Sequence, residues 1–211
     1  MNNIKRMVLA ILCVLALCLT AWGAAAEPAD FIGENAYGAG GVIRVQVTMD
    51  GDKIVKIKTL EQSETAGLGT TAIVQLTKTI VKANSLEVDS VSGATLTSIS
   101  FKAAVRQAVE TALGVDPTAG IELGENEYLG LSENALGGRL LIKATIADGV
   151  ISAIDILEAY ESSEVGIPAL ETMKQRIIEA NSTEVDSISG ATVTCKAICE
   201  AVHQAVESAA Q

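Results

Sequence analysis

The sequence predicts an α+β fold made of two tandem repeats, each an antiparallel β-hairpin or sheet packed with helices. A polar motif near residue 90 recurs 97 residues later, and strand-like and helix-like patterns surround both copies in the same order. The chain of 211 residues is long enough for two small domains. We expect these domains at residues 28–115 and 127–211, joined by a linker at residues 116–126 rich in Gly, Asp and Glu.

A predicted β-hairpin lies early in each repeat. The segments are GGVIRVQVTMDGDKIVKIKTLEQSE, residues 40–64, and GGRLLIKATIADGVISAIDILEAYE, residues 137–161. In the first segment, Ile43, Val45 and Val47 share one face of an alternating pattern. The pairs Asp50-Gly51 and Asp148-Gly149 are typical of hairpin turns.

Two predicted helices follow in each repeat, one on either side of the motif. Residues 70–83 and 168–180 form the first helix of each repeat, and Pro168 suits a first helical turn. The second helices carry apolar stripes and end at Gly114 and near the end of the chain. Those stripes consist of Val105, Val109, Ala112 and Leu113, and of Ile198, Val202, Ala205 and Val206.

Residues 1–26 have the pattern of a secretory signal peptide. A basic pair at Lys5-Arg6 precedes the apolar run Met7–Leu19, and the small residues Ala24–Ala26 suit cleavage, so the mature chain is expected to begin near Glu27. An uncleaved membrane anchor and a lipoprotein modified at Cys18 are the alternatives. The pattern predicts an exported protein that is extracellular, bound to the cell surface or periplasmic.

The charge and the cysteine spacing argue against nucleic-acid binding and against a structural zinc site. Without residues 1–26, the chain has 13 basic and 26 acidic residues, a net charge of −13. It has no stripe of basic residues of the kind that binds nucleic acid. Cys195 and Cys199 lie four apart on a predicted helix, a poor spacing for a disulfide. With His203 alone beside them, they also lack the paired Cys ligands of a structural zinc site, so we expect no metal.

The repeated motif indicates a ligand site. ANSLEVDSVSGATLT, residues 83–97, and ANSTEVDSISGATVT, residues 180–194, are identical at 12 of 15 positions. Small polar residues before a helix are typical of an N-terminal cap, but a cap alone would tolerate exchange among Ser, Thr, Asn and Asp. A Gly-Ala pair lets a ligand approach the backbone, and a helix start offers N–H donors and a positive dipole. The expected ligand is a phosphate monoester.

At these residues the sequence resembles a known family. DSVSGATLTS, residues 89–98, is similar to the flavinylation motif of the FMN-binding domain family, which includes peripheral flavoprotein subunits of sodium-pumping NADH:quinone oxidoreductase and of Rnf-type complexes. The second copy, residues 186–194, is equally similar. The resemblance implies that a flavin transferase joins FMN through a phosphoester to the Thr that closes SGAT, here Thr95 and Thr192.

The resemblance also implies further site residues. Asp89 and Asp186 belong to the recognition motif, and ETAGLG, residues 64–69, is similar to a family segment ETPGLG that lies near the flavin, with Ala66 in place of Pro. The implied cofactor-binding residues are Asp89, Ser92, Gly93, Ala94, Thr95 and Thr97; Asp186, Ser189, Gly190, Ala191, Thr192 and Thr194; and Glu64, Thr65, Gly67, Leu68 and Gly69.

The second repeat departs from the first at two positions near the motif. In ESSEVG, residues 161–166, Glu164 replaces a Gly, and a carboxylate near the ring predicts a lower redox potential for the flavin of that repeat. Cys195 replaces Ser98, either as a redox-active thiol beside a flavin or as a small semi-buried hydrophobe.

These features predict an electron-transfer flavoprotein rather than a stand-alone enzyme. It would carry up to two covalent FMN groups and pass electrons from a membrane-bound donor to an extracytoplasmic acceptor or reductase. Two alternatives remain open at this point. One is a surface repeat module with a binding or structural role and no redox turnover. The other is an FMN-bearing accessory domain of a separate reductase.

Overall fold

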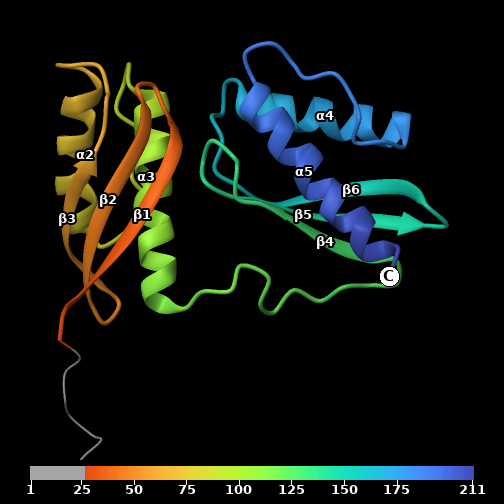
Figure 1. Cartoon of the computed structure of the whole chain (residues 1–211), viewed down its shortest axis with the longest axis horizontal. Helices are drawn as coiled ribbons and strands as arrows, with labels where there is room; N and C mark the ends of the chain where they lie inside the picture. Colours follow the sequence, from red (N-terminus) through yellow and green to blue (C-terminus); the bar gives the residue numbers. More distant parts are fainter. Residues whose placement is uncertain (1–26) are drawn as a thin grey trace, which may run out of the picture.

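The computed structural model describes residues 27–211, so the expected signal peptide lies outside the described residues. The chain forms two units of the same architecture, joined by an irregular segment (Figure 1). The first unit contains β1 (Ala29–Gly38), β2 (Gly41–Asp50), β3 (Lys53–Glu61), α2 (Gly69–Ala83) and α3 (Thr95–Leu113). The second unit contains β4 (Glu127–Ser132), β5 (Leu140–Ala147), β6 (Val150–Ala159), α4 (Gly166–Ala180) and α5 (Thr192–Ala209). The predicted α+β repeat fold is confirmed.

Each unit is one antiparallel sheet with two helices on one face. The strand orders are β1-β2-β3 and β4-β5-β6. In the first unit α3 packs on β1 and β2, and α2 packs on β3. The pairing of β2 with β3 shifts register at Arg44/Val45 and again at Thr48/Met49, and β5 with β6 shifts at the equivalent positions. The repeat therefore extends to the irregularities of the sheets.

Each unit has its own hydrophobic core. The predicted strand face Ile43, Val45 and Val47 is fully buried and packs with Phe101 of α3. In the second unit, strand residues such as Ile142 pack against the inner faces of α4 and α5. Two separate cores mean that each unit is held together chiefly by its own packing.

The first strand of each unit was not predicted. Gly33 in β1 and Gly130 in β4 interrupt the alternation of apolar residues, and the structure shows the reason for both. A Cβ on Gly33 would lie 1.9 Å from the carbonyl oxygen of Ala104, and one on Gly130 would lie 1.9 Å from that of Ala201. These glycines let α3 and α5 cross the strands at close range.

Several predicted boundaries were wrong. The helices after the motif begin earlier than expected, at Thr95 and Thr192, within the polar motif itself. Leu113, placed on the buried stripe, is 48% exposed because it ends α3 beyond the sheet. The first hairpin turns at Gly51 and the following residue, one position later than predicted, whereas the second turns at Asp148-Gly149 as predicted.

Part of the repeated motif is explained by the fold. Asn84 and Asn181 end α2 and α4 in the left-handed conformation, with φ of 49° and 47°. The side chain of Asn84 accepts a hydrogen bond from the backbone N–H of Ile54 at 2.7 Å, and Asn181 does the same for Ile151 at 2.8 Å. The two identical asparagines therefore attach a helix to the hairpin of their unit, and their recurrence does not by itself indicate a ligand.

Among residues 27–211, the structure contains no helix with the length and apolar character needed to cross a membrane.

Candidate functional site

The SGAT motif forms the start of a helix without a side-chain cap. Ala94 is the residue before α3, with φ of −127° and ψ of 42°, and no side-chain hydrogen bond caps the helix there. Ala191 occupies the same position before α5, also without a cap. No side chain of the motif therefore caps either helix. The first N–H groups of each helix have no carbonyl partner one turn earlier in the helix, so they remain donors for a ligand.

A glycine turns the chain immediately before each helix. Gly93 has φ of 78° and Gly190 has φ of 82°, in the left-handed region that favours glycine. The turn is closed by hydrogen bonds from the N–H of Ala94 to the carbonyl of Val91 at 2.9 Å, and from Ala191 to Ile188 at 3.1 Å. The Gly of SGAT is thus required by backbone geometry.

The residue after the motif supports the same turn from inside. The Ser98 hydroxyl donates to the carbonyl of Ala94 at 2.7 Å and accepts from the N–H of Val91 at 3.0 Å. In the second unit, the sulfur of buried Cys195 accepts from the N–H of Ile188 at 3.3 Å. Cys195 therefore replaces Ser98 in a structural role. Burial raises the pKa of the nearby Cys199 thiol, which disfavours a reactive thiolate there.

A glutamate, buried in the first unit and half-buried in the second, fixes the start of each motif helix to the hairpin. The carboxylate of Glu64, 7% exposed, accepts from the Thr97 hydroxyl and from the N–H of Gly40 at 3.0 Å. Glu161 repeats this arrangement, accepting from Thr194 at 2.8 Å and from the N–H of Leu136 at 3.1 Å. Glu64 was predicted to flank a cofactor, and the structure places both glutamates beneath the motif as supports.

The two supporting glutamates bear on the charge of the site. Burial raises the pKa of Glu161, and hydrogen bonds from Thr194 and from backbone N–H groups oppose that rise.

The hydroxyls of Thr97 and Thr194 are occupied by their hydrogen bonds to Glu64 and Glu161, and both threonines are buried. Thr95 and Thr192, two positions earlier, are exposed. Of the two threonines in each motif, only the one that closes SGAT presents its side chain at the surface.

A cavity of about 270 Å³ surrounds Thr95 within the first unit. It brings together two segments predicted to form one site, the ETAGLG loop and the SGAT motif. Its walls include exposed Leu68, at 47%, and Leu96, at 48%, which offer apolar surface beside the Thr95 hydroxyl. Of the predicted residues, Thr65, Leu68, Gly69, Gly93, Ala94, Thr95 and Thr97 line this cavity.

Other predicted residues lie outside this cavity. Asp89 is exposed and lines a separate hollow beside α2, and Asp186 lines the equivalent side of the second unit. Ser92, Ser189 and Gly67 are exposed at the surface of their loops. The exposed aspartates are accessible to another protein but are not part of the cavity around Thr95.

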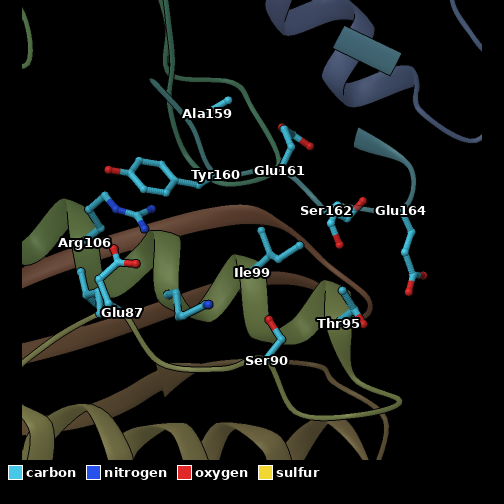
Figure 2. A pocket seen from close by; sticks show the side chains of 13 residues that line it. Glu87, Ser90, Thr95, Ile99, Arg106, Ala159, Tyr160, Glu161, Ser162 and Glu164 are labelled. Atoms are coloured by element: carbon cyan, nitrogen blue, oxygen red, sulfur yellow. The ribbon is translucent and has the colours of Figure 1, made fainter. Parts of the chain in front are cut away.

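A second cavity, of about 450 Å³, also reaches Thr95 and is shared by the two units. Figure 2 shows Ser90, Thr95, Ile99 and Arg106 of the first unit facing the chain that runs from Ala159 to Glu164 in the second. Sequence reasoning missed the lining residues Lys102, Arg106 and Tyr160. Helical spacing could have identified Lys102 and Arg106, because positions 95, 99, 102 and 106 fall on one face of α3.

The shared cavity contains two cations that the second unit lacks. Lys102 donates to the carbonyl of Val88 at 3.0 Å, and burial lowers its pKa, with Arg106 adding to the effect. Burial also lowers the pKa of Arg106, which is 9% exposed. The equivalent positions on α5 hold Cys199 and His203, and His203 is exposed. The environments of Thr95 and Thr192 therefore differ in charge.

Glu164 also reaches the first unit. Its expected effect on the flavin of the second unit stays a prediction, and its side chain lines the shared cavity together with Thr95 of the first unit (Figure 2). Within the described residues, no group of three or more His, Cys, Asp or Glu side chains is placed to hold a metal ion. The chemistry of the site rests on exposed hydroxyls at uncapped helix starts.

Comparison with known proteins agrees with this geometry. The sequence pattern of the FMN-binding domain matches the chain twice, at residues 38–110 and 136–207. A segment of 91 residues, 43% of this chain, is 43% identical to urocanate reductase of Eggerthella lenta and covers 15% of that protein. A segment of 86 residues, 41% of this chain, is 33% identical to NADH:acrylate oxidoreductase of Vibrio harveyi and covers 8% of that protein.

The chain thus spans a small part of these longer relatives, whose names are those of redox enzymes. The matches support an FMN-bearing electron-transfer role. Each segment that the family pattern matches, residues 38–110 and residues 136–207, contains an SGAT motif, most of the helix that it begins and the hairpin that supports it. The chain belongs to the FMN-binding domain family and carries two copies of that domain.

Proposed function

We propose that Thr95 and Thr192 each carry FMN through a phosphoester bond and that the protein is an extracytoplasmic electron carrier. One observation carries the proposal. In both units the exposed hydroxyl of the motif belongs to the first residue of an uncapped helix, while the neighbouring Thr97 or Thr194 is buried and bonded to a glutamate. A phosphate held on Thr95 or Thr192 would meet free N–H donors and the positive end of the helix dipole.

The residues around Thr95 fit FMN. Its hydroxyl can form the ester, Gly93 lets the phosphate lie close to the backbone, and Leu68 and Leu96 offer apolar surface to a flat ring. When bound, FMN would supply the electron-transfer chemistry, and the chain would hold it, orient it and set its electrostatic surroundings. Covalent attachment would also prevent loss of the cofactor by dilution outside the cytoplasm.

Attachment requires a second protein. The new bond joins the threonine oxygen to the phosphorus of FMN, so the hydroxyl must lose its proton and an activated FMN donor must lose its leaving group. Among residues 27–211, His203 is the one histidine, and it lies on the exposed face of α5, far along the helix from Thr192. A separate flavin transferase therefore supplies the catalysis in this proposal, and the exposed Asp89 and Asp186 are available for it to recognise.

Intact-mass measurement of the full chain, co-produced with a flavin transferase, tests the proposal. The expected result is two additions of FMN less water, one of which is lost in Thr95→Val and one in Thr192→Val. Thr79→Val is the matched control, because Thr79 is an exposed helical threonine outside the motif. An unmodified chain in the presence of a transferase that modifies a known acceptor would defeat the proposal.

A second candidate is an FMN-bearing accessory subunit of a separate reductase. The observation that favours it is that the relatives contain the matching segment within much longer chains. The present chain would then hand electrons to a partner rather than reduce a substrate itself. Stopped-flow oxidation of the reduced holo-protein tests this candidate. We expect no oxidation by urocanate or acrylate alone, and rapid oxidation by either compound without a partner would refute it.

Export is the third part of the proposal and rests on residues 1–26. The basic pair Lys5-Arg6, the apolar run and Ala24–Ala26 support cleavage before Glu27. The mass of the protein recovered from outside the cytoplasm tests this step. A chain that begins near Glu27 agrees with it, and a full-length chain confined to the cytoplasm contradicts it.

A further inference from the structure

The repeats differ in chemistry at three positions where the two units touch. At equivalent positions, Arg106 corresponds to His203, Tyr160 to Ser63, and Arg139 to Val42. Arg106, Tyr160 and Arg139 all lie between the units. Residues that are identical in both repeats, such as Asn84 and Asn181, stabilise each unit internally. Arg106, Tyr160 and Arg139 have no counterpart of similar chemistry in the other repeat.

Two arginines join the units. Arg106 of α3 donates to the carbonyl of Gly137 at 3.0 Å, and its guanidinium lies 3.3 Å from the centre of the Tyr160 ring. Arg139, which begins the second hairpin, donates to Glu110 of α3 at 2.8 and 2.9 Å and to Glu158 at 2.6 and 3.1 Å. The Arg139 side chain is only 12% exposed, so this pairing is partly shielded from water.

These contacts place the chain from Ala159 to Glu164 across the face of α3 that begins with Thr95 (Figure 2). The same short segment reaches the other motif, because Glu161 holds Thr194, two residues after Thr192. Ser162 and Glu164 then continue along the shared cavity on the Thr95 side. One loop of the second unit therefore contacts the surroundings of both SGAT motifs.

We propose that the Thr95 site is composite, with the second unit forming its outer wall, and that Glu164 acts on the flavin carried by Thr95 rather than on the flavin of its own unit. This rests on the proposed attachment of FMN at Thr95. The wall would bring the Glu164 carboxylate into the 450 Å³ cavity at its Thr95 end, and the same cavity is lined by Lys102 and Arg106. The second unit has no such wall, since the equivalent face of α5 carries exposed Lys196 and His203.

Redox titration of two single-flavin proteins tests the assignment of Glu164. Thr192→Val leaves the Thr95 flavin alone, and Thr95→Val leaves the Thr192 flavin alone. Reduction adds negative charge to a flavin, so removal of a nearby carboxylate by Glu164→Gln raises its midpoint potential. We expect a rise in the Thr192→Val background that exceeds any change in the Thr95→Val background. A larger shift in the Thr95→Val background, equal shifts or no shift would overturn the proposal.

Two controls isolate the effect. Glu122→Gln removes the same charge from the exposed linker and should leave both potentials unchanged. Absence of FMN from the Thr192→Val protein would be seen at once in its mass and would refute the attachment proposal rather than the composite wall. The wall is then still tested by a measurement that needs no flavin.

Hydrogen exchange on the unflavinylated full chain provides that measurement. Arg106→Met keeps the apolar stem of the side chain but removes the contacts to Gly137 and Tyr160. We expect faster amide exchange across residues 135–139 and 158–164, while the cores of both units keep their protection. His203→Met, the equivalent change on the exposed face of α5, should leave exchange unchanged. Unaltered exchange in Arg106→Met would overturn the composite site.

Discussion

Replacement of Glu161 by Ala tests whether this half-buried glutamate supports the second motif. The change removes the acceptor of two hydrogen bonds, from the Thr194 hydroxyl at 2.8 Å and from the N–H of Leu136 at 3.1 Å. Thr194 is buried, so its hydroxyl loses this partner where water has little access. The start of α5 is then no longer attached to the beginning of the second hairpin.

The expected loss of stability follows from these contacts. Hydrogen bonds to a charged group are worth about 1.5–3 kcal/mol each, and burial of the carboxylate itself offsets part of that gain, so we expect a net loss of about 3 kcal/mol. For a unit of this size, such a loss lowers the melting temperature by roughly 12–24 °C. Because Thr192 lies two residues from Thr194, the yield of FMN at Thr192 should fall as well.

Burial also predicts the pH dependence of the effect. The pKa of Glu161 is raised above its ordinary value of 4.5, so the folded unit binds the proton more tightly than the unfolded chain. The stability that Glu161 contributes is therefore greatest below about pH 4.5 and declines as the pH rises through the higher, folded-state pKa. Glu161→Gln keeps the shape but cannot ionise, so its stability should decline less over that range.

Thermal unfolding followed by circular dichroism, at several pH values, measures both effects. Glu179→Ala is the control, because Glu179 is exposed on α4 and should unfold like the unchanged protein. Melting of Glu161→Ala within about 3 °C of the control would refute the supporting role, since a loss near 3 kcal/mol requires a far larger shift. An identical pH profile in Glu161→Gln would refute the raised pKa.

Three further changes follow from the fold. Asn181→Ala removes the hydrogen bond to Ile151 and strains a residue with φ of 47°, so chemical denaturation should show a loss of about 1–3 kcal/mol in the second unit. Gly33→Ala forces a Cβ to within 1.9 Å of the Ala104 carbonyl, so circular dichroism should show a first unit that unfolds well below the second. Arg139→Leu removes the ion pair with Glu110 that joins the units, so calorimetry should resolve two melting transitions further apart than in the unchanged protein.

Each of the three has a contrary result. Unchanged denaturation of Asn181→Ala would mean that the helix end does not depend on its contact with the hairpin. Normal melting of Gly33→Ala would show that α3 can move away from β1 at little cost. Identical calorimetric traces for Arg139→Leu would mean that its ion pair with Glu110 does not couple the units.

The repeated motif and local patterns made much of the fold predictable. Alternation identified the buried face Ile43, Val45 and Val47, and helical periodicity located α2 within one residue of its start. The strands containing Gly33 and Gly130 escaped prediction because their glycines serve a contact with a helix far away in sequence. Local alternation carries no information about such a contact.

The site was predictable to a similar degree. The SGAT motif and the ETAGLG loop were expected to meet, and they share the cavity around Thr95. The role of Glu64 beneath Thr97 depends on the angle at which hairpin and helix meet, which spacing does not specify. The shared cavity with Tyr160 and Glu164 arises from contacts between units, and single-repeat patterns do not encode it.

Peptide mapping by tandem mass spectrometry of the chain produced with a flavin transferase tests the central claim most directly. The account predicts FMN, less one water, on the two peptides that contain residues 95 and 192, with fragment ions that locate it at Thr95 and Thr192. Modification at Thr97 or Thr194 instead, or FMN that dissociates on denaturation and leaves both peptides unmodified, would contradict the claim.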